Sequence, residues 1–106
     1  PKPGILTEPT QVKANLIGEI LGPDSFGNLL TNLPGYKIDQ SSPLVTHGLS
    51  LSWVETYQQA PIGELVGLIG SDGFVEVALR DGSALSWLGD KALGAIIECR
   101  AVGSVQ

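Results

Sequence analysis

Glycine, proline and aspartate divide this sequence into short apolar runs, and that spacing limits the folds that the chain can adopt. There are 14 glycines and 7 prolines among 106 residues. The apolar repeat of 3.6 residues that a packed helix needs is almost absent. Several runs instead alternate bulky residues with small or polar ones, as strands with one buried face do. The spacing therefore predicts an all-β domain.

Six strands are expected from this pattern, and they span residues 12–21, 27–33, 44–53, 64–69, 74–79 and 94–102. The fourth and fifth strands form a hairpin, because the Ser-Asp-Gly between them is a tight-turn signal. In the third strand the alternation places His47 in the middle, among the bulky residues, as a core or edge histidine rather than a catalyst. Residues 83–88 are the one helical segment, and Gly89 is expected to end it.

Many short strands leave many unpaired edges unless the sheet closes on itself. We therefore expect a small closed antiparallel β-barrel, Greek-key-like, with one short helix. A length of 106 residues suits a single domain. Three prolines in the first nine residues favour a linker or N-terminal extension over residues 1–10, which leaves residues 11–106 for the barrel.

The charge balance disfavours nucleic acid as a partner. Eleven acidic and six basic residues give a net charge of −5, and the basic residues do not cluster. No apolar run approaches the roughly 20 residues of a membrane helix, so a soluble, cytoplasmic protein without a membrane partner is expected. The chain starts at Pro1, which fits removal of an initiator methionine or a domain cut from a larger protein. We favour the larger protein.

The sequence holds no complete active site. There is no Gly-x-Ser-x-Gly elbow, and no plausible nucleophile lies near His47. One histidine and one cysteine cannot by themselves bind a metal, and Cys99 is interpreted as a buried thiol in a strand. Asp24, Asp72 and Asp81 lie in turns, where bonds from the side chain to the backbone explain them without a function. No catalytic residue and no metal ligand is assigned, and the chain alone is expected to be inert.

Two asparagines stand out because strands usually avoid this residue. Asn28 and Asn32 both fall in the second expected strand. One interpretation is that they bond to the backbone at a bulge or at the barrel rim. The other is that an amide reads a purine edge, since it can donate and accept at once, beside Phe26 or Tyr57 as a stacking face. We assign Asn28 with Phe26 to a purine site and Asn32 to the structure.

The segment Asp24-Ser25-Phe26-Gly27-Asn28-Leu29-Leu30-Thr31-Asn32 resembles the D-x-F-G-N-x-x-T-N signature of the S-adenosylmethionine hydroxide adenosyltransferases. These enzymes are relatives of those that halogenate S-adenosylmethionine at C5′, the SAM-dependent fluorinases and chlorinases. Further segments agree in order and spacing, namely residues 56–57, 62–64, 70–78, 82–84 and 88–89. The resemblance covers residues 15–100.

The resemblance implies the C-terminal β-barrel domain of a two-domain protein, whose N-terminal α/β domain is not part of this chain and carries the residues that position water. It implies trimers in which S-adenosylmethionine lies between one subunit's N-terminal domain and its neighbour's C-terminal domain. Phe26 and Asn28 would then lie at the adenine, with Asp24 near them and Tyr57 over the purine. Ser71 would lie in the turn that meets the methionine carboxylate.

Two departures from the halogenating relatives point to the hydroxide branch. Asp72 stands where those relatives have an arginine, and Leu30 stands where they have an aromatic residue. The resemblance therefore implies the nucleoside-binding domain of an enzyme that hydrolyses S-adenosylmethionine to adenosine and L-methionine, with no cofactor besides this substrate. The alternative is a noncatalytic β-barrel that serves oligomer assembly or binds another small ligand.

Overall fold

The computed structural model describes residues 10–12 and 15–102. Strands make up 49% of the structure, which confirms the all-β class. The strands are β1 (Thr10–Val12), β2 (Asn15–Pro23), β3 (Leu29–Pro34), β4 (Leu44–Thr46), β5 (Leu49–Trp53), β6 (Leu65–Ile69), β7 (Phe74–Leu79) and β8 (Ile96–Arg100). One α-helix, α1 (Ala84–Leu88), is joined by the 3-10 turns η1 (Gly35–Lys37), η2 (Tyr57–Gln59) and η3 (Gly89–Lys91).

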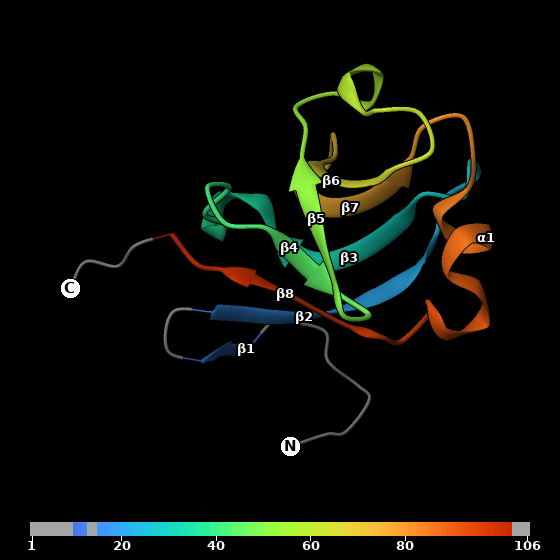
Figure 1. The fold of residues 1–106 in the computed structure, drawn as a ribbon. Coiled ribbons are helices and arrows are strands. Elements are labelled where there is room, and N and C mark those ends of the chain that lie inside the picture. Colours follow the sequence, from blue (N-terminus) through green and yellow to red (C-terminus); the bar gives the residue numbers. More distant parts are fainter. Residues whose placement is uncertain (1–9, 13–14, 103–106) are drawn as a thin grey trace.

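The sheet closes into a barrel of seven strands, as expected. Around the ring the order is β2, β3, β7, β6, β5, β4 and β8, and β8 pairs back with β2. β1 pairs with β2 and is not part of the ring (Figure 1). The neighbours β3 and β7, like β4 and β8, are far apart in sequence, so the barrel is not a simple meander.

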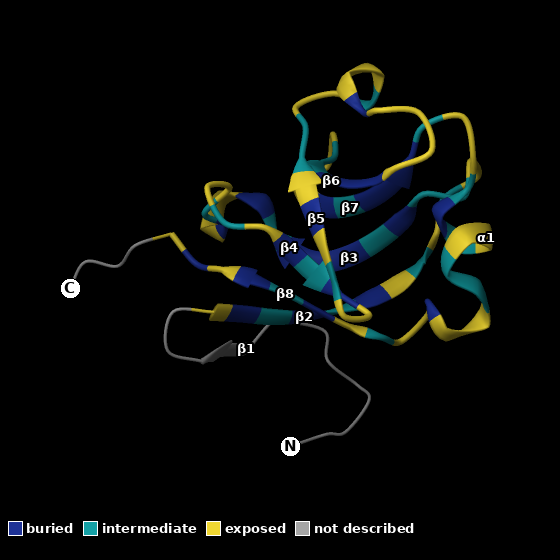
Figure 2. Cartoon of the chain, in the orientation of Figure 1, coloured by how far each residue is buried: buried dark blue, intermediate teal, exposed yellow. Residues whose placement is uncertain are grey.

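Aliphatic side chains from every strand of the ring fill the interior. Figure 2 shows the buried segments running along the strands, while the connecting loops are mostly exposed. Among the fully buried side chains are Leu16, Ile20, Leu29, Leu33, Leu44, Val75, Val77 and Ile97. Burying one such side chain stabilises a fold by roughly 1.5–3 kcal/mol. This core holds the barrel without a disulfide, since the chain has one cysteine.

β2 reaches both of its neighbours by changing partner along its length. Its first part, up to Glu19, pairs with β8, and from Ile20 onward it pairs with β3. The register shifts after Ile20 and again in β3 between Leu30 and Pro34. Such irregularities bend a strand and leave backbone groups that need other partners.

The side chain of Asn32 supplies one of these partners. Its Oδ1 accepts from the backbone N–H of Glu19 at 2.8 Å, and the residue is 4% exposed. A Cβ on Gly18 would lie 2.5 Å from that oxygen, so the glycine leaves room for the amide. This is the backbone bond across the strand pair that we predicted for Asn32.

The hairpin of β6 and β7 and the helix α1 are confirmed. Ser83 caps α1 by accepting from the N–H of Ser86 at 3.1 Å, and Gly89 ends it with φ +81°. Leu85 and Leu88 pack against the core. The 3-10 turns are additions to the single short helix that the sequence predicted.

The prediction of one strand over residues 44–53 is wrong. His47 has φ +55° and Gly48 has φ +73°, so the two residues form a tight turn between β4 and β5. Two positive φ angles are typical of the two-residue turns that match the twist of a hairpin. His47 is therefore exposed in a turn rather than mid-strand in the core.

The prediction of antiparallel pairing is wrong at one seam. β5 and β6 run parallel, with Ser52 opposite Val66 and Trp53 opposite Gly67. Parallel strands need a crossover connection. Residues 54–64, which include η2, provide it and lie at the top of the view in Figure 1.

Cys99 is buried, as expected, on the strand that closes the barrel. It lies opposite Leu16 of β2, and the residue is 3% exposed. Burial is the main cause that raises the pKa of the Cys99 thiol to about 11. The group is therefore an unreactive thiol at neutral pH.

The linker predicted over residues 1–10 lies outside the described residues except for Thr10, which begins β1.

Within residues 10–12 and 15–102, the structure has no helix that is both long and apolar enough to cross a membrane.

Asn32→Ala is expected to lower the free energy of unfolding by about 1–3 kcal/mol, because the sheltered N–H of Glu19 loses its acceptor. Urea unfolding at pH 7 measures this change. The control is Asn15→Ala, the same substitution at an exposed side chain that makes no hydrogen bond within the described residues. Equal midpoints for the two variants would contradict the role assigned to Asn32.

Candidate functional site

One carboxylate organises the turn between β2 and β3. Oδ1 of Asp24 accepts from the backbone N–H of Phe26 at 2.8 Å and from that of Asn28 at 3.0 Å. Oδ2 of Asp24 accepts from Nδ2 of Asn28 at 3.2 Å. Gly27 has φ +86°, which favours glycine. These local bonds hold Phe26 and Asn28 in place.

The contact with Asp24 also fixes which way the Asn28 amide faces. A carboxylate only accepts hydrogen bonds, so Nδ2 of Asn28 must be the atom on that side. Oδ1 of Asn28 makes no hydrogen bond to any other described residue. Asn28 is half-buried, and it can offer a ligand one free acceptor and one remaining N–H.

The turn is joined to the start of α1. The backbone N–H of Leu85 donates to the carbonyl of Gly27 at 3.0 Å. A Cβ on Gly27 would collide with Oγ of Ser83. Only glycine allows so close an approach, so this position brings the turn and the helix together.

Tyr57 of η2 contacts the corner that follows β7. Its hydroxyl accepts from the N–H of Asp81 at 2.7 Å and donates to the carbonyl of Leu79 at 3.2 Å. Tyr57 and Gly82 line the same pocket. Three segments that are far apart in sequence thus meet at this place.

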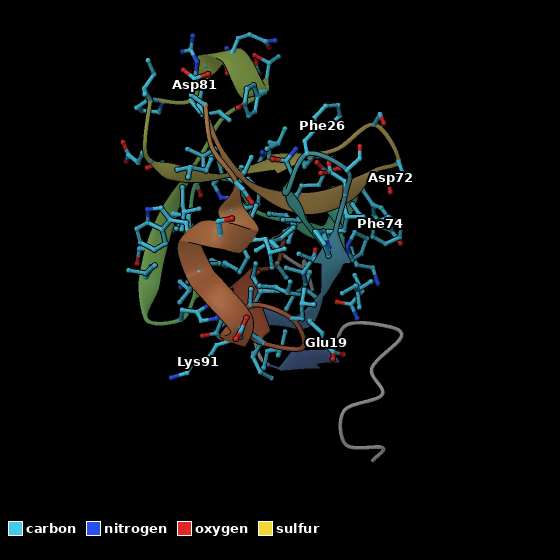
Figure 3. The ribbon with its side chains drawn as sticks, turned by 90° about the vertical axis from the view of Figure 1, so that its right-hand side faces the viewer. Glu19, Phe26, Asp72, Phe74, Asp81 and Lys91 are labelled. Carbon is cyan, nitrogen blue, oxygen red and sulfur yellow. The ribbon has the colours of Figure 1, made fainter. Side chains whose placement is uncertain are left out.

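The pocket has a volume of about 360 Å³ and is lined by Phe26, Asn28, Tyr57 and Gly82. This volume lies in the range of small-molecule sites, about 300–1,000 Å³. In Figure 3, Phe26 lies between the turn that carries Asp81 and the turn that carries Asp72. Phe26 is 79% exposed, so it offers an uncovered aromatic ring at the rim.

The structure brings together three of the five residues that were predicted to bind a nucleoside: Phe26, Asn28 and Tyr57 line the pocket. Asp24 accepts a hydrogen bond from the side-chain amide of Asn28 and orients it. Ser71 is exposed in the turn between β6 and β7 and does not line this pocket. Gly82 was not predicted as a site residue; the agreement of residues 82–84 with the family was the signal that could have found it.

Carboxylates gather beside the turn of Asp24. Burial first, and then the negative charges of Asp24 and Asp72, raise the pKa of Glu76 above its usual range. Glu76 lies on β7 opposite Leu30 of β3. The turn therefore has a negative electrostatic environment.

The pocket lining contains no complete set of catalytic groups. Asn28 does not titrate, and the Tyr57 hydroxyl is engaged with the backbone. Among residues 10–12 and 15–102, no three His, Cys, Asp or Glu side chains lie close enough to hold a metal ion. What the arrangement offers is aromatic surface and an oriented amide, which suits binding.

Fold and pocket together define a small β-barrel domain with a ligand-sized pocket at the convergence of three loops. The chain belongs to the family of the SAM hydroxide adenosyltransferase C-terminal domain, whose family model matches residues 18–96.

Two solved structures resemble this chain. One is a conserved hypothetical protein from Thermus thermophilus, with 32% identity and a TM-score of 0.68 over 81% of this chain. The other is an uncharacterized conserved protein from Thermotoga maritima, with 25% identity and a TM-score of 0.68 over 88% of this chain. The chain covers 34% and 39% of the length of these two relatives.

Glu76→Gln is expected to raise the free energy of unfolding at pH 7, because it removes a charge that the folded state disfavours. The folded pKa lies above the usual value of 4.5, so the penalty is absent below that pH and present above the folded pKa. The gain should therefore vanish as the pH falls below 4.5.

Urea unfolding at several pH values between about 4 and 7 measures this gain. Glu55→Gln makes the same change at an exposed position and is the control. A gain that does not depend on pH, or no gain at pH 7, would contradict the electrostatic explanation.

Proposed function

We propose that this domain binds the adenosyl part of S-adenosylmethionine for an enzyme that hydrolyses this substrate to adenosine and L-methionine. The observation that carries the proposal is that Phe26, Asn28 and Tyr57 line one pocket. Phe26 and Asn28 come from the motif by which the chain resembles the family, and the family match makes an S-adenosylmethionine-related ligand the first candidate.

The lining suits an adenine base. Oδ1 of Asn28 is free to accept from the exocyclic amine, and the second N–H of its amide can donate to a ring nitrogen. Phe26 and Tyr57 offer aromatic surface, and stacking of a base on such a surface contributes about 1–3 kcal/mol. Asp24 acts through Asn28, because it holds the amide in the orientation that leaves Oδ1 free.

In the proposed reaction the oxygen of water attacks C5′ in line with the departing sulfur. The C5′–O bond forms while the C5′–S bond breaks, and the sulfur keeps the electron pair and becomes a neutral thioether. The water proton passes to a base. The described pocket lining offers none, so this chain positions the nucleoside, and a second domain supplies the group that activates water.

We place that second domain on a neighbouring subunit, in a homotrimer of the cytoplasmic full-length protein. The length of the relatives beyond the matched part leaves room for such a domain. Phe26, an aromatic ring that is 79% exposed at the pocket rim, would gain apolar burial against it. Ser71, which lies outside the pocket, would then contact the methionine carboxylate rather than the base.

Asn28→Ala is expected to weaken adenosine binding ten- to hundredfold, because it removes a contact with the base edge worth about 1–3 kcal/mol. Isothermal titration calorimetry with adenosine measures the affinity of this chain, and thermal melting confirms that the variant is folded. Asn15→Ala is the matched control. Equal affinity for Asn28→Ala and wild type would contradict the role of Asn28.

Chromatography tests the hydrolysis itself. S-adenosylmethionine incubated with this chain alone should yield no adenosine above the protein-free control, whereas the full-length protein should yield adenosine and L-methionine. If wild-type chain and full-length protein both fail to bind adenosine, the proposal is wrong, and a barrel for assembly or for another ligand is the better interpretation.

A further inference from the structure

The hydroxyl of Tyr57 uses both of its hydrogen-bonding functions on the backbone of one corner. It accepts from the N–H of Asp81 at 2.7 Å and donates to the carbonyl of Leu79 at 3.2 Å. The same carbonyl accepts from the N–H of Gly82 at 3.2 Å. The hydroxyl therefore holds Leu79 and Asp81, the residues on either side of Arg80, in the turn that leads to Gly82.

The corner needs such a partner because its backbone conformation is an uncommon one. Asp81 has φ +62°, in the left-handed region that residues with a side chain adopt rarely. Its exposed side chain makes no hydrogen bond within the described residues that would hold this conformation. Two bonds hold it instead: the one from the Asp81 N–H to Tyr57 and the one across the turn from the Gly82 N–H to the Leu79 carbonyl.

The other end of the contact, η2, is held by hydrogen bonds of its own. Nη1 of Arg80 donates to the carbonyls of Gln58 at 2.9 Å and Ala60 at 3.2 Å. These bonds fix η2, and with it Tyr57, to the end of β7. The hydroxyl thus connects a fixed element to a corner that has an unfavourable conformation.

We propose that the Tyr57 hydroxyl is a positioning group that sets the shape of the nucleoside pocket by holding the Asp81–Gly82 corner. The ring of Tyr57 forms one part of the pocket wall, and its hydroxyl places Gly82, which forms another. This inference rests on the proposed function for its ligand. The contacts themselves do not depend on any ligand.

Tyr57→Phe tests the inference, since it keeps the ring and removes the hydroxyl. Amide hydrogen exchange by NMR at Asp81 and Gly82 should become about fivefold or more faster without ligand, because the corner opens more often. Adenosine affinity, measured by calorimetry, should fall about fivefold. Tyr36→Phe is the matched control, because Tyr36 is 79% exposed and its hydroxyl makes no hydrogen bond within the described residues.

A second variant separates positioning from direct contact with the nucleoside. Asp81→Gly introduced into Tyr57→Phe lets the corner adopt a positive φ without the hydroxyl, so part of the lost affinity should return. Affinity that Asp81→Gly does not restore would overturn the inference in favour of direct contact. Unchanged exchange and unchanged affinity in Tyr57→Phe would overturn it outright. Wild-type protein that binds no adenosine would contradict the proposed function instead.

Discussion

The barrel depends on the change of partner within β2. A single strand closes the ring because its first part pairs with β8 and its second part with β3. At the crossing point the ladder cannot satisfy the N–H of Glu19, so Oδ1 of Asn32 does so at 2.8 Å. An unpaired sheltered N–H is costly, and Gly18 is needed because any side chain there would occupy the place of the amide.

This arrangement also explains where the pocket lies. β2 passes directly into the turn of Asp24, so the bend that closes the barrel determines where Phe26 and Asn28 are presented. The close approach of Gly27 to Ser83 then brings the start of α1 beside that turn. The site is built on the ends of core strands, and its loops are held by short local bonds.

Local signals were enough to predict much of this structure. Alternation and turn residues indicated the hairpin of β6 and β7, and the stop residue Gly89 indicated the end of α1. They failed at His47 and Gly48, because the alternation of bulky residues continues through the turn and histidine is a less common turn residue than asparagine. The parallel pairing of β5 and β6 joins segments with no local relation, so no periodicity could reveal it.

The residues of the candidate site, too, were predicted only in part from the sequence. Phe26, Asn28 and Tyr57 were predicted from side-chain chemistry and from resemblance. Gly82 lies in a segment that agrees with the family, residues 82–84, but it was given no role because it offers no side chain. Asp24 accepts three bonds within its own turn and orients Asn28, and its contact with a ligand stays a prediction. Sequence patterns indicate which side chains gather at the site, and the hydrogen bonds show which of their polar atoms remain available to bind a ligand.

The burial of Cys99 has a kinetic consequence. The chain has one thiol, and it faces inward on β8 at the seam that closes the ring, with a pKa of about 11. Its Sγ also lies 3.9 Å from the carbonyls of Asp39 and Ser42 in the loop before β4. A thiol reagent can therefore modify it only after the seam or this loop has moved away. When modification is slow compared with reclosure, its rate measures the fraction of molecules in which Cys99 is exposed at any moment. Cys99 is therefore a natural probe for the free energy of opening around β8, one that needs no added label.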